Sequence, residues 1–551
     1  MDVKEKLGVL RMYKNKITQA LLLGAGLATA SFSTFAAHVP EDTQLADVQE
    51  LVRGNGAEVE SLDPHKVSGV PESHIIIDLQ EGLVNQDADG NTVPGAAESW
   101  ETKDNKTWIF HIRKDAKWSN GDPVTAQDFV YSWRRLVDPA TASPYSSYLE
   151  VATIVNAADI VAGKKKPEEL GVKALDDKTL EVQLSEALPY FVAMTVHTSM
   201  KPVNQKVVEK WGDNWTSPEH YVGNGAYSLD SWVVNERIVL KRNENYWDNE
   251  HTVINKVTYL PIENQVSDMN RFLAGEVDIT YEMPNEHFKR LKKEYPDQVQ
   301  VTPYLCSYYY NFNTERAPFD DVRVRKALSY AVDRDVIANF VVGKGETPAY
   351  NFTPLATNGL KVDMPEYSKW TQKERVEKAK ELLKEAGFGP DHPLSFNLLY
   401  NTSENHKKIA VALTSMWKKE LGVNAQLENQ EWKTYLDNEH EGNYDVVRAG
   451  WCGDYNEAST FLSTLVTGNS NNYPRYSSKE YDQALANALS APSVDERAEN
   501  YRKAEAQLAE DMPILPVYHY VNARLVNPKV GGYPIHNAED NIFTKDLYKI
   551  K

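Results

Sequence analysis

Residues able to recognise a charged ligand are grouped in three segments of the last third of the chain. The first runs from Tyr400 to His406, the second from Glu428 to Trp432, and the third is Arg448-Ala-Gly-Trp-Cys-Gly-Asp454. Together they supply a guanidinium, an imidazole, aromatic faces, carboxylates and glycine backbone that a ligand can approach closely. Such a set suits a molecule with separated positive and negative ends. Ordinary loop residues at a sheet edge would give the same pattern, so both interpretations stay open here.

Catalytic chemistry has weaker support in the sequence. Ser415-Met-Trp-Lys418 fits the Ser-x-x-Lys of penicillin-recognising enzymes, but the companion Ser-Asp-Asn and Lys-Thr-Gly motifs are missing from the sequence. It also contains no Gly-x-Ser-x-Gly elbow and no phosphate-binding loop, and its 13 histidines show no metal-ligand spacing. We therefore expect no catalytic residue, no metal and no cofactor, and we interpret Ser415 and Lys418 as part of a helix face.

The three ligand-recognising segments follow predicted strands. Residues 394–400 alternate between apolar and other types, and strands are also predicted at 423–427 and 444–449. Because helices are predicted between these strands, we expect right-handed crossovers and a largely parallel sheet. Open parallel sheets bind ligands at the carboxyl ends of their strands, which is where the three segments lie.

The helices of this region have recognisable ends. Thr371 and Glu374 form a capping box that opens one helix, and Gly387 closes it. A second helix places Ile409, Leu413 and Trp417 on one face and stops at Gly422, and a short helical stretch is predicted around Trp432 to Leu436. In the first half of the chain the alternation instead predicts strands, at 108–112, 179–184, 238–242 and 256–260.

Composition and the amino terminus indicate an exported protein. The chain has 551 residues and a net charge of −19, which argues against nucleic acid as a partner. Residues 1–36 read as a signal peptide, with a basic start, an apolar run and small residues before a cut at Ala37; a retained membrane anchor is the alternative. Since disulfides persist outside the cytosol, we predict a bridge between Cys306 and Cys452, with two buried free thiols as the alternative.

Several motifs, in one order along the chain, resemble the periplasmic oligopeptide-binding proteins of ABC importers, members of extracellular solute-binding protein family 5. The likeness runs from about Leu51 to the last residue. The segments that carry it are Ala97–Trp100, Lys114–Trp118, Pro123–Trp133, Leu399–Ser403, Gln430–Lys433, Arg448–Asp454 and Asn522–Val526. Both cysteines match those of the family, which strengthens the predicted bridge.

The resemblance implies an α/β fold of the two-lobed periplasmic binding protein type, class II or cluster C, with three domains and mixed sheets. After the signal peptide, 37–80, 204–305 and 522–551 would form a discontinuous first-lobe domain. Residues 81–203 would form a smaller inserted domain, and 306–521 a second-lobe α/β domain. In such proteins the lobes close over an extended peptide.

The resemblance also implies a role for each site residue. Asp454 would meet the amino terminus of the peptide, and Arg448 and His406 would meet its carboxylate. The main chain of Gly450, Cys452 and the segment around Val70 would pair with the peptide as with an added strand. The candidate walls of hydrated side-chain pockets are Trp432, Trp451, Tyr145, Tyr304 and Tyr520.

Four positions depart from the family pattern. Val342 stands where close relatives have a lysine, with Lys344 two residues away, and Glu439 replaces an arginine. Ser68 and Asn311 replace glutamates of the pocket region. Since a lost cation leaves a buried carboxylate short of a partner, we expect a different preference for peptide length and for basic side chains.

The resemblance thus implies a monomeric, non-enzymatic periplasmic protein of a Gram-negative bacterium. It would capture short peptides with broad side-chain specificity and deliver them to an inner-membrane ABC permease complex. A binding protein specific for murein tripeptide is the nearest alternative, although the two cysteines favour the general peptide binder. A periplasmic peptidase, a penicillin-recognising enzyme and a chaperone for unfolded chains are further alternatives.

Overall fold

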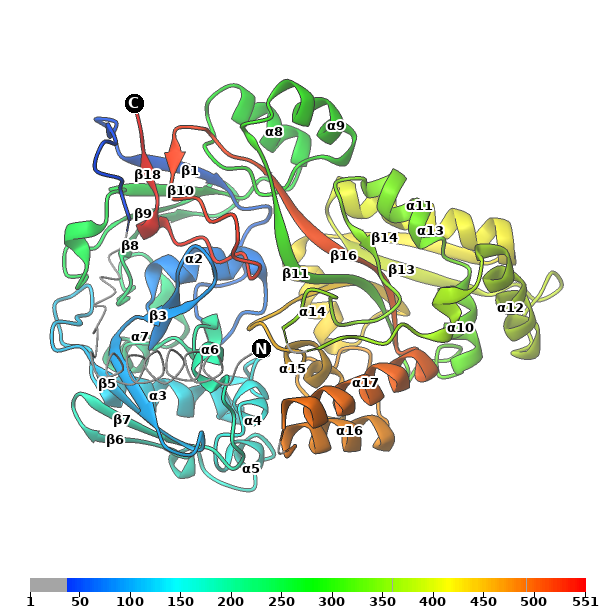
Figure 1. Cartoon of the computed structure of the whole chain (residues 1–551), viewed down its shortest axis with the longest axis horizontal. Helices are drawn as coiled ribbons and strands as arrows, with labels where there is room; N and C mark the ends of the chain where they lie inside the picture. The colour runs from blue at the N-terminus through cyan, green and yellow to red at the C-terminus, as the bar shows by residue number, and fades with distance from the viewer. Residues whose placement is uncertain (1–36, 359, 492) are drawn as a thin grey trace, which may run out of the picture. The chain divides into compact units, whose positions relative to one another are not determined.

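The computed structural model describes residues 37–358, 360–491 and 493–551. The predicted signal peptide lies outside these residues. Over the described part of the chain the fold is mixed α/β, as predicted, with several sheets covered by helices (Figure 1). No helix in this part is both long and apolar enough to cross a membrane.

A four-stranded mixed sheet is built from both early and central segments. Its order is β1 (Glu50–Gly54), β10 (Lys256–Leu260), β9 (Arg237–Arg242) and β8 (Tyr227–Val233). Strands β1 and β10 are parallel, and the other pairs are antiparallel. The predicted strands at 238–242 and 256–260 are confirmed, and their alternate residues join a core with helix α2 (Val70–Leu79).

A second four-stranded sheet confirms the strands predicted at 108–112 and 179–184. It is antiparallel, in the order β4 (Ala97–Thr102), β5 (Thr107–Ile112), β7 (Thr179–Gln183) and β6 (Val172–Asp176). Alternate side chains of β5 are buried, and helix α3 (Ala126–Val137) packs against β6 and β7. A capping box of Thr125 and Asp128 opens this helix.

The six-stranded sheet corrects one prediction. Its order is β12 (Thr347–Pro348), β16 (Ile514–Leu525), β11 (Val299–Phe312), β15 (Val446–Cys452), β13 (Ser395–Asn401) and β14 (Asn424–Gln430). The three predicted strands β13, β14 and β15 are parallel, but β11, β16 and β12 are antiparallel to their neighbours. "Largely parallel" was therefore wrong for the whole sheet, because distant segments of the chain supply its other half.

Strands β11 and β16 run side by side (Figure 1). Their side chains contribute to two hydrophobic cores. Val299 and Leu525 belong to a core with helices α8 (Gln265–Leu273) and α9 (Asn285–Glu294), whereas Tyr308 and Tyr518 belong to the core of the parallel strands. Their pairing is irregular between Pro303 and Ser307. The predicted domain borders at 305/306 and 521/522 fall inside these two strands, and the borders remain predictions.

The helices beside the parallel strands begin and end as predicted. Helix α12 (Gln372–Glu385) opens on the Thr371 and Glu374 capping box, and α13 (Glu404–Leu421) stops at Gly422, whose φ of +71° suits glycine. The short helix α14 extends further than expected, over Trp432–Glu441.

Strand β15 also extends beyond its predicted end. It continues to Cys452 because β11 pairs with it along its whole length, with Cys306 opposite Cys452. These two cysteines form the predicted disulfide, which links positions 146 apart in the sequence. Arg448, Gly450 and Cys452 therefore lie within a strand rather than in the loop that follows it.

Candidate functional site

Two adjoining cavities meet at strand β15. The Asp454 cavity is lined by Asp454, Tyr145, His197 and Glu439 among others, and has a volume of about 140 Å³. The His406 cavity, of about 180 Å³, is lined by residues that include His406. Either is several times larger than the roughly 10–15 Å³ that one water molecule needs. The residues common to both are Ser68, Gly69, Val70, Tyr304, Trp432, Arg448, Gly450 and Cys452.

The structure brings the predicted site residues together. Asp454, Tyr145 and Trp451 line the Asp454 cavity, and His406 and Tyr520 line the His406 cavity. The other six line both, namely Val70, Tyr304, Trp432, Arg448, Gly450 and Cys452. Their proximity is a fact of the fold, whereas the roles assigned to them remain predictions.

One edge of β15 is open where it borders the cavities. On one side β15 pairs with β11 as far as Cys452, but on the other it pairs with β13 only through Val446 and Val447. The backbone of Gly450–Cys452 is therefore unmatched by β13. An extended chain could add to this edge by main-chain hydrogen bonds, which bind a peptide regardless of its side chains.

Two glycines near this edge lie where a side chain would crowd the site. A Cβ added at Gly450 would lie 3.0 Å from the Arg448 guanidinium, and one at Gly69 would clash with Glu72 Oε2 and lie 2.9 Å from the Trp432 ring. Glycine at these positions therefore leaves room for Arg448 and Trp432, which line both cavities.

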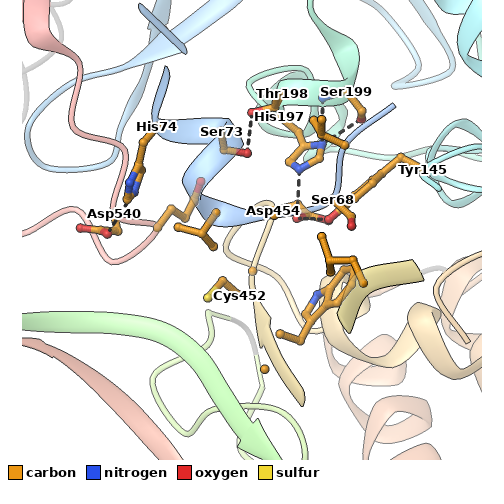
Figure 2. A pocket seen from close by; sticks show the side chains of 18 of the residues that line it. Ser68, Ser73, His74, Tyr145, His197, Thr198, Ser199, Cys452, Asp454 and Asp540 are labelled. Carbon is orange, nitrogen blue, oxygen red and sulfur yellow. Dashed lines mark hydrogen bonds and ion pairs between the residues drawn. The ribbon is translucent and has the colours of Figure 1, made fainter. Parts of the chain in front are cut away.

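The Asp454 carboxylate is buried and held by neutral groups (Figure 2). The Tyr145 hydroxyl donates to its Oδ1 at 3.4 Å, and His197 Nε2 lies 3.2 Å from the same oxygen. The Asp454 backbone N–H donates to Thr460 Oγ1 at 2.8 Å. Burial raises the pKa of Asp454 well above its ordinary value, against the lowering effect of the Tyr145 hydrogen bond. A cation brought to this carboxylate would favour its ionised form.

The hydrogen bonds of His197 fix its tautomer. The Ser199 backbone N–H, which can only donate, points at His197 Nδ1 from 3.3 Å. Nδ1 is therefore the acceptor, and Nε2 carries the hydrogen that is donated to Asp454. Burial and then the charge of Lys201 lower the pKa of His197 to about 3, so the ring is neutral near pH 7.

Sequence reasoning missed His197. It precedes a 3₁₀ turn (Thr198–Met200), where the sequence has no periodic pattern and no neighbouring motif to mark it. The rings of Tyr145 and Tyr148 pack on it, with centroids 4.6 and 4.9 Å from its own. Its only cue was that it belongs to the predicted inserted domain, which must face the second lobe if the two close.

Arg448 is a buried cation without an acidic partner. Its Nη2 donates to the Tyr520 hydroxyl at 2.6 Å and its Nη1 to Asn401 Oδ1 at 3.4 Å, while the guanidinium lies 4.8 Å from the centre of the Tyr308 ring. Its Nε has no hydrogen-bond partner among the described residues, and no ion pair among them includes it. An anionic ligand would supply the missing counter-charge.

His406 can assist Arg448 as a neutral donor. Burial, followed by the charges of Arg448 and Lys344, holds the pKa of His406 well below its usual range. Its Nδ1 is buried and has no partner among the described residues. The ring therefore has one nitrogen free for a ligand atom, and it contributes hydrogen bonding rather than positive charge.

Lys344 does not take the place of the lysine that relatives have at Val342. Its Nζ lies 2.6 Å from Glu282 and 3.8 Å from Glu346, and it lines neither cavity. Val342 is buried in the core at the end of a π-helix (Ile337–Val342). Among the described residues that line the two cavities, no lysine is therefore available to hold a peptide carboxylate.

Comparisons with known proteins agree with this geometry. Residues 91–473 match the family described as "Bacterial extracellular solute-binding proteins, family 5 Middle". The periplasmic oligopeptide-binding protein OppA of Salmonella typhimurium is 57% identical over 541 residues, which are 98% of this chain and 100% of that protein.

Solved structures distinguish two conformations. OppA of Haemophilus influenzae in complex with the peptide RPPGFSPFR is 52% identical, with a TM-score of 0.91 over 92% of this chain and 100% of that one. The murein tripeptide-binding protein MppA of Escherichia coli is 49% identical and has the same TM-score and coverage. An unliganded open form of MppA, 48% identical, gives 0.65 over 93% and 99% of the two chains. The chain belongs to the bacterial extracellular solute-binding proteins of family 5.

Proposed function

We propose that the protein captures short peptides in the two cavities, with broad side-chain specificity. One observation carries this proposal: the open edge of β15 lies between a buried carboxylate, Asp454, and a buried guanidinium, Arg448, that has no counter-ion. An extended peptide has an ammonium group, a hydrogen-bonding backbone and a carboxylate in this order. Its chemistry therefore complements the site at three points.

In this mechanism the peptide ammonium binds Asp454, and the backbone pairs with Gly450–Cys452 and with the segment at Val70. Arg448, assisted by His406, binds the carboxylate. Side chains enter the cavities, where water molecules can satisfy varied polar groups and thereby permit broad specificity. Peptides of the length that brings their terminal carboxylate to Arg448 bind best.

Closure of two lobes would bury the peptide. We infer that 81–203, together with the discontinuous domain at 37–80, 204–305 and 522–551, faces the second lobe at 306–521. Support comes from the crossing strands β11 and β16, and from the higher TM-score against peptide-bound OppA than against unliganded open MppA.

We further propose that the protein works as a monomer in the periplasm of a Gram-negative bacterium and delivers peptides to an inner-membrane ABC permease complex. The name of its Salmonella relative and the sequence of residues 1–36 support this location. No catalytic role is proposed. Ser415 donates to Val411 O at 2.7 Å, while Lys418 donates to Asn424 at 2.6 Å, so neither activates the other.

Calorimetry with trialanine tests the proposal. We expect binding that is lost when the amino group is acetylated, because Asp454 then has no ammonium to pair with. Binding of murein tripeptide alone would instead favour the murein-specific alternative, and cleavage of peptides detected by mass spectrometry would favour an enzyme.

A further inference from the structure

The Asp454 cavity has more acidic side chains than one peptide ammonium needs. Asp454, Glu439, Glu539 and Asp540 line it, whereas Arg448 is the one lysine or arginine among the described residues that do so. Asp540 is neutralised by Arg524, through two hydrogen bonds of 2.6 and 2.7 Å. Glu439 has no such partner, because no ion pair among the described residues includes it.

Glu439 is placed to meet a ligand side chain. It lies on α14, is only 5% exposed, and accepts a hydrogen bond from Asn311 Nδ2 at 3.2 Å. Arg448 directs its own hydrogen bonds to Tyr520 and Asn401, and among the described residues it forms no hydrogen bond or ion pair with Glu439. It acts on the Glu439 carboxylate only through its charge, which lowers the pKa of Glu439 against the effect of burial.

The surroundings of Glu439 suit a long cationic side chain. Asn311 is fully buried on β11 and does not itself line the cavity; it holds the Glu439 carboxylate through its Nδ2. The rings of Tyr309, Tyr435 and Tyr473 line the same cavity as Glu439. Aromatic faces pack against methylene groups and attract cations, and the carboxylate oxygens of Glu439 can accept N–H bonds.

We propose that Glu439, held in place by Asn311, forms a subsite for a lysine-like side chain of the bound peptide. The ligand class is thus a short peptide with two positive charges, its ammonium at Asp454 and a second amine or guanidinium at Glu439. This inference rests on the proposed capture of peptides.

Calorimetry with tripeptides tests the subsite. Lysine and norleucine, whose side chain has the same four carbons but lacks the terminal ammonium, are placed in turn at each position of trialanine. We expect lysine to bind about tenfold or more tightly than norleucine at one position. Glu439→Gln should remove this preference, while Glu441→Gln, an exposed change on the same helix, should preserve it.

The outcomes separate the two proposals. Failure of trialanine itself to bind would overturn peptide capture and the subsite together. If trialanine binds but lysine and norleucine bind equally at every position, the subsite alone is wrong. An unchanged lysine preference in Glu439→Gln would also refute it. The wild-type comparison decides the question even if that variant does not fold.

Discussion

The two charged ends of the site are assembled in different ways. The groups around Arg448, namely Asn401, Tyr308 and Tyr520, all lie on strands of the same six-stranded sheet. Asp454 instead receives its hydrogen bonds from Tyr145 and His197, which belong to a distant part of the chain. The proposed anion-binding end is thus built within one sheet, whereas the proposed ammonium-binding end also needs Tyr145 and His197, which come from residues 81–203.

Of the changes at the two ends, removal of the Asp454 charge should weaken peptide binding most. We expect Asp454→Asn to weaken trialanine binding by about 2–5 kcal/mol, because the peptide ammonium is then buried without a counter-charge. Calorimetry gives the affinity, and acetylated trialanine, which has no ammonium, is the control. Equal affinity of the variant and the wild type for trialanine would contradict the role of Asp454.

At the other end, Arg448→Gln should cost about 2 kcal/mol for peptides whose carboxylate reaches it. Peptides of three to five alanines, each with a free or an amidated carboxyl end, identify the length at which this contact forms. The amidated series should bind wild type and variant alike. A variant that loses no affinity at any length would show that the carboxylate binds elsewhere.

Changing the pH should alter the preference for lysine over norleucine by less than the two substitutions above alter affinity. Burial raises the pKa of Glu439 to about 7, against the lowering effect of Arg448. Below that pH the free carboxyl is protonated, and a lysine ammonium must displace the proton, so the preference falls as the pH falls. Tyr309, Tyr435, Tyr444 and Tyr473 interact with Glu439, and their raised pKa values keep them neutral. Asp454 and Glu539 line the same cavity, and burial raises the pKa of both, that of Glu539 to about 8.

Measuring the lysine to norleucine affinity ratio at pH 6 and pH 8 tests this expectation. The ratio should rise by up to about tenfold at the higher pH, the change expected for one proton. Both peptides share the same terminal groups, whose titration cancels in the ratio. A ratio that is constant, or that falls as the pH rises, would count against an ionisable Glu439.

Substitutions of His197 should change the affinity for trialanine least. His197→Leu removes one donor to Asp454 and should weaken trialanine binding by about 1 kcal/mol. His197→Gln can still donate, so it should restore most of the loss, which a purely structural role would not predict. Thermal unfolding of both variants controls for stability, and equal affinities of the two variants would argue against a hydrogen-bonding role.

The same contrast explains what the sequence could predict. Alternation of apolar and other residues predicted strands β5, β7, β9, β10 and β13, and glycines predicted the ends of α12 and α13. Both signals could be used because they depend only on residues that are neighbours in the sequence. The Arg448 to Asp454 segment was recognisable since its residues are adjacent. The antiparallel half of the large sheet was not, because β11 and β16 pair with segments far away in the sequence.

The side chains that complete the site were harder to predict. His197 reaches Asp454 only through the tertiary fold, and no pattern around it distinguishes it from an ordinary loop histidine. Lys344 appeared available in the sequence, yet the fold pairs it with Glu282. In both cases the chemistry depends on contacts between segments that local patterns do not report.

The disulfide has a consequence for the release of cargo. It joins Cys452, on the strand whose edge faces the cavities, to Cys306, within the irregular stretch of β11 between Pro303 and Ser307. A rotation at that stretch would therefore carry β15 along with β11 and preserve the shape of the binding edge. Under the proposed mechanism, unloading would proceed by withdrawing the opposite wall, with Tyr145 and His197, while the strand proposed to hold the peptide backbone stays intact.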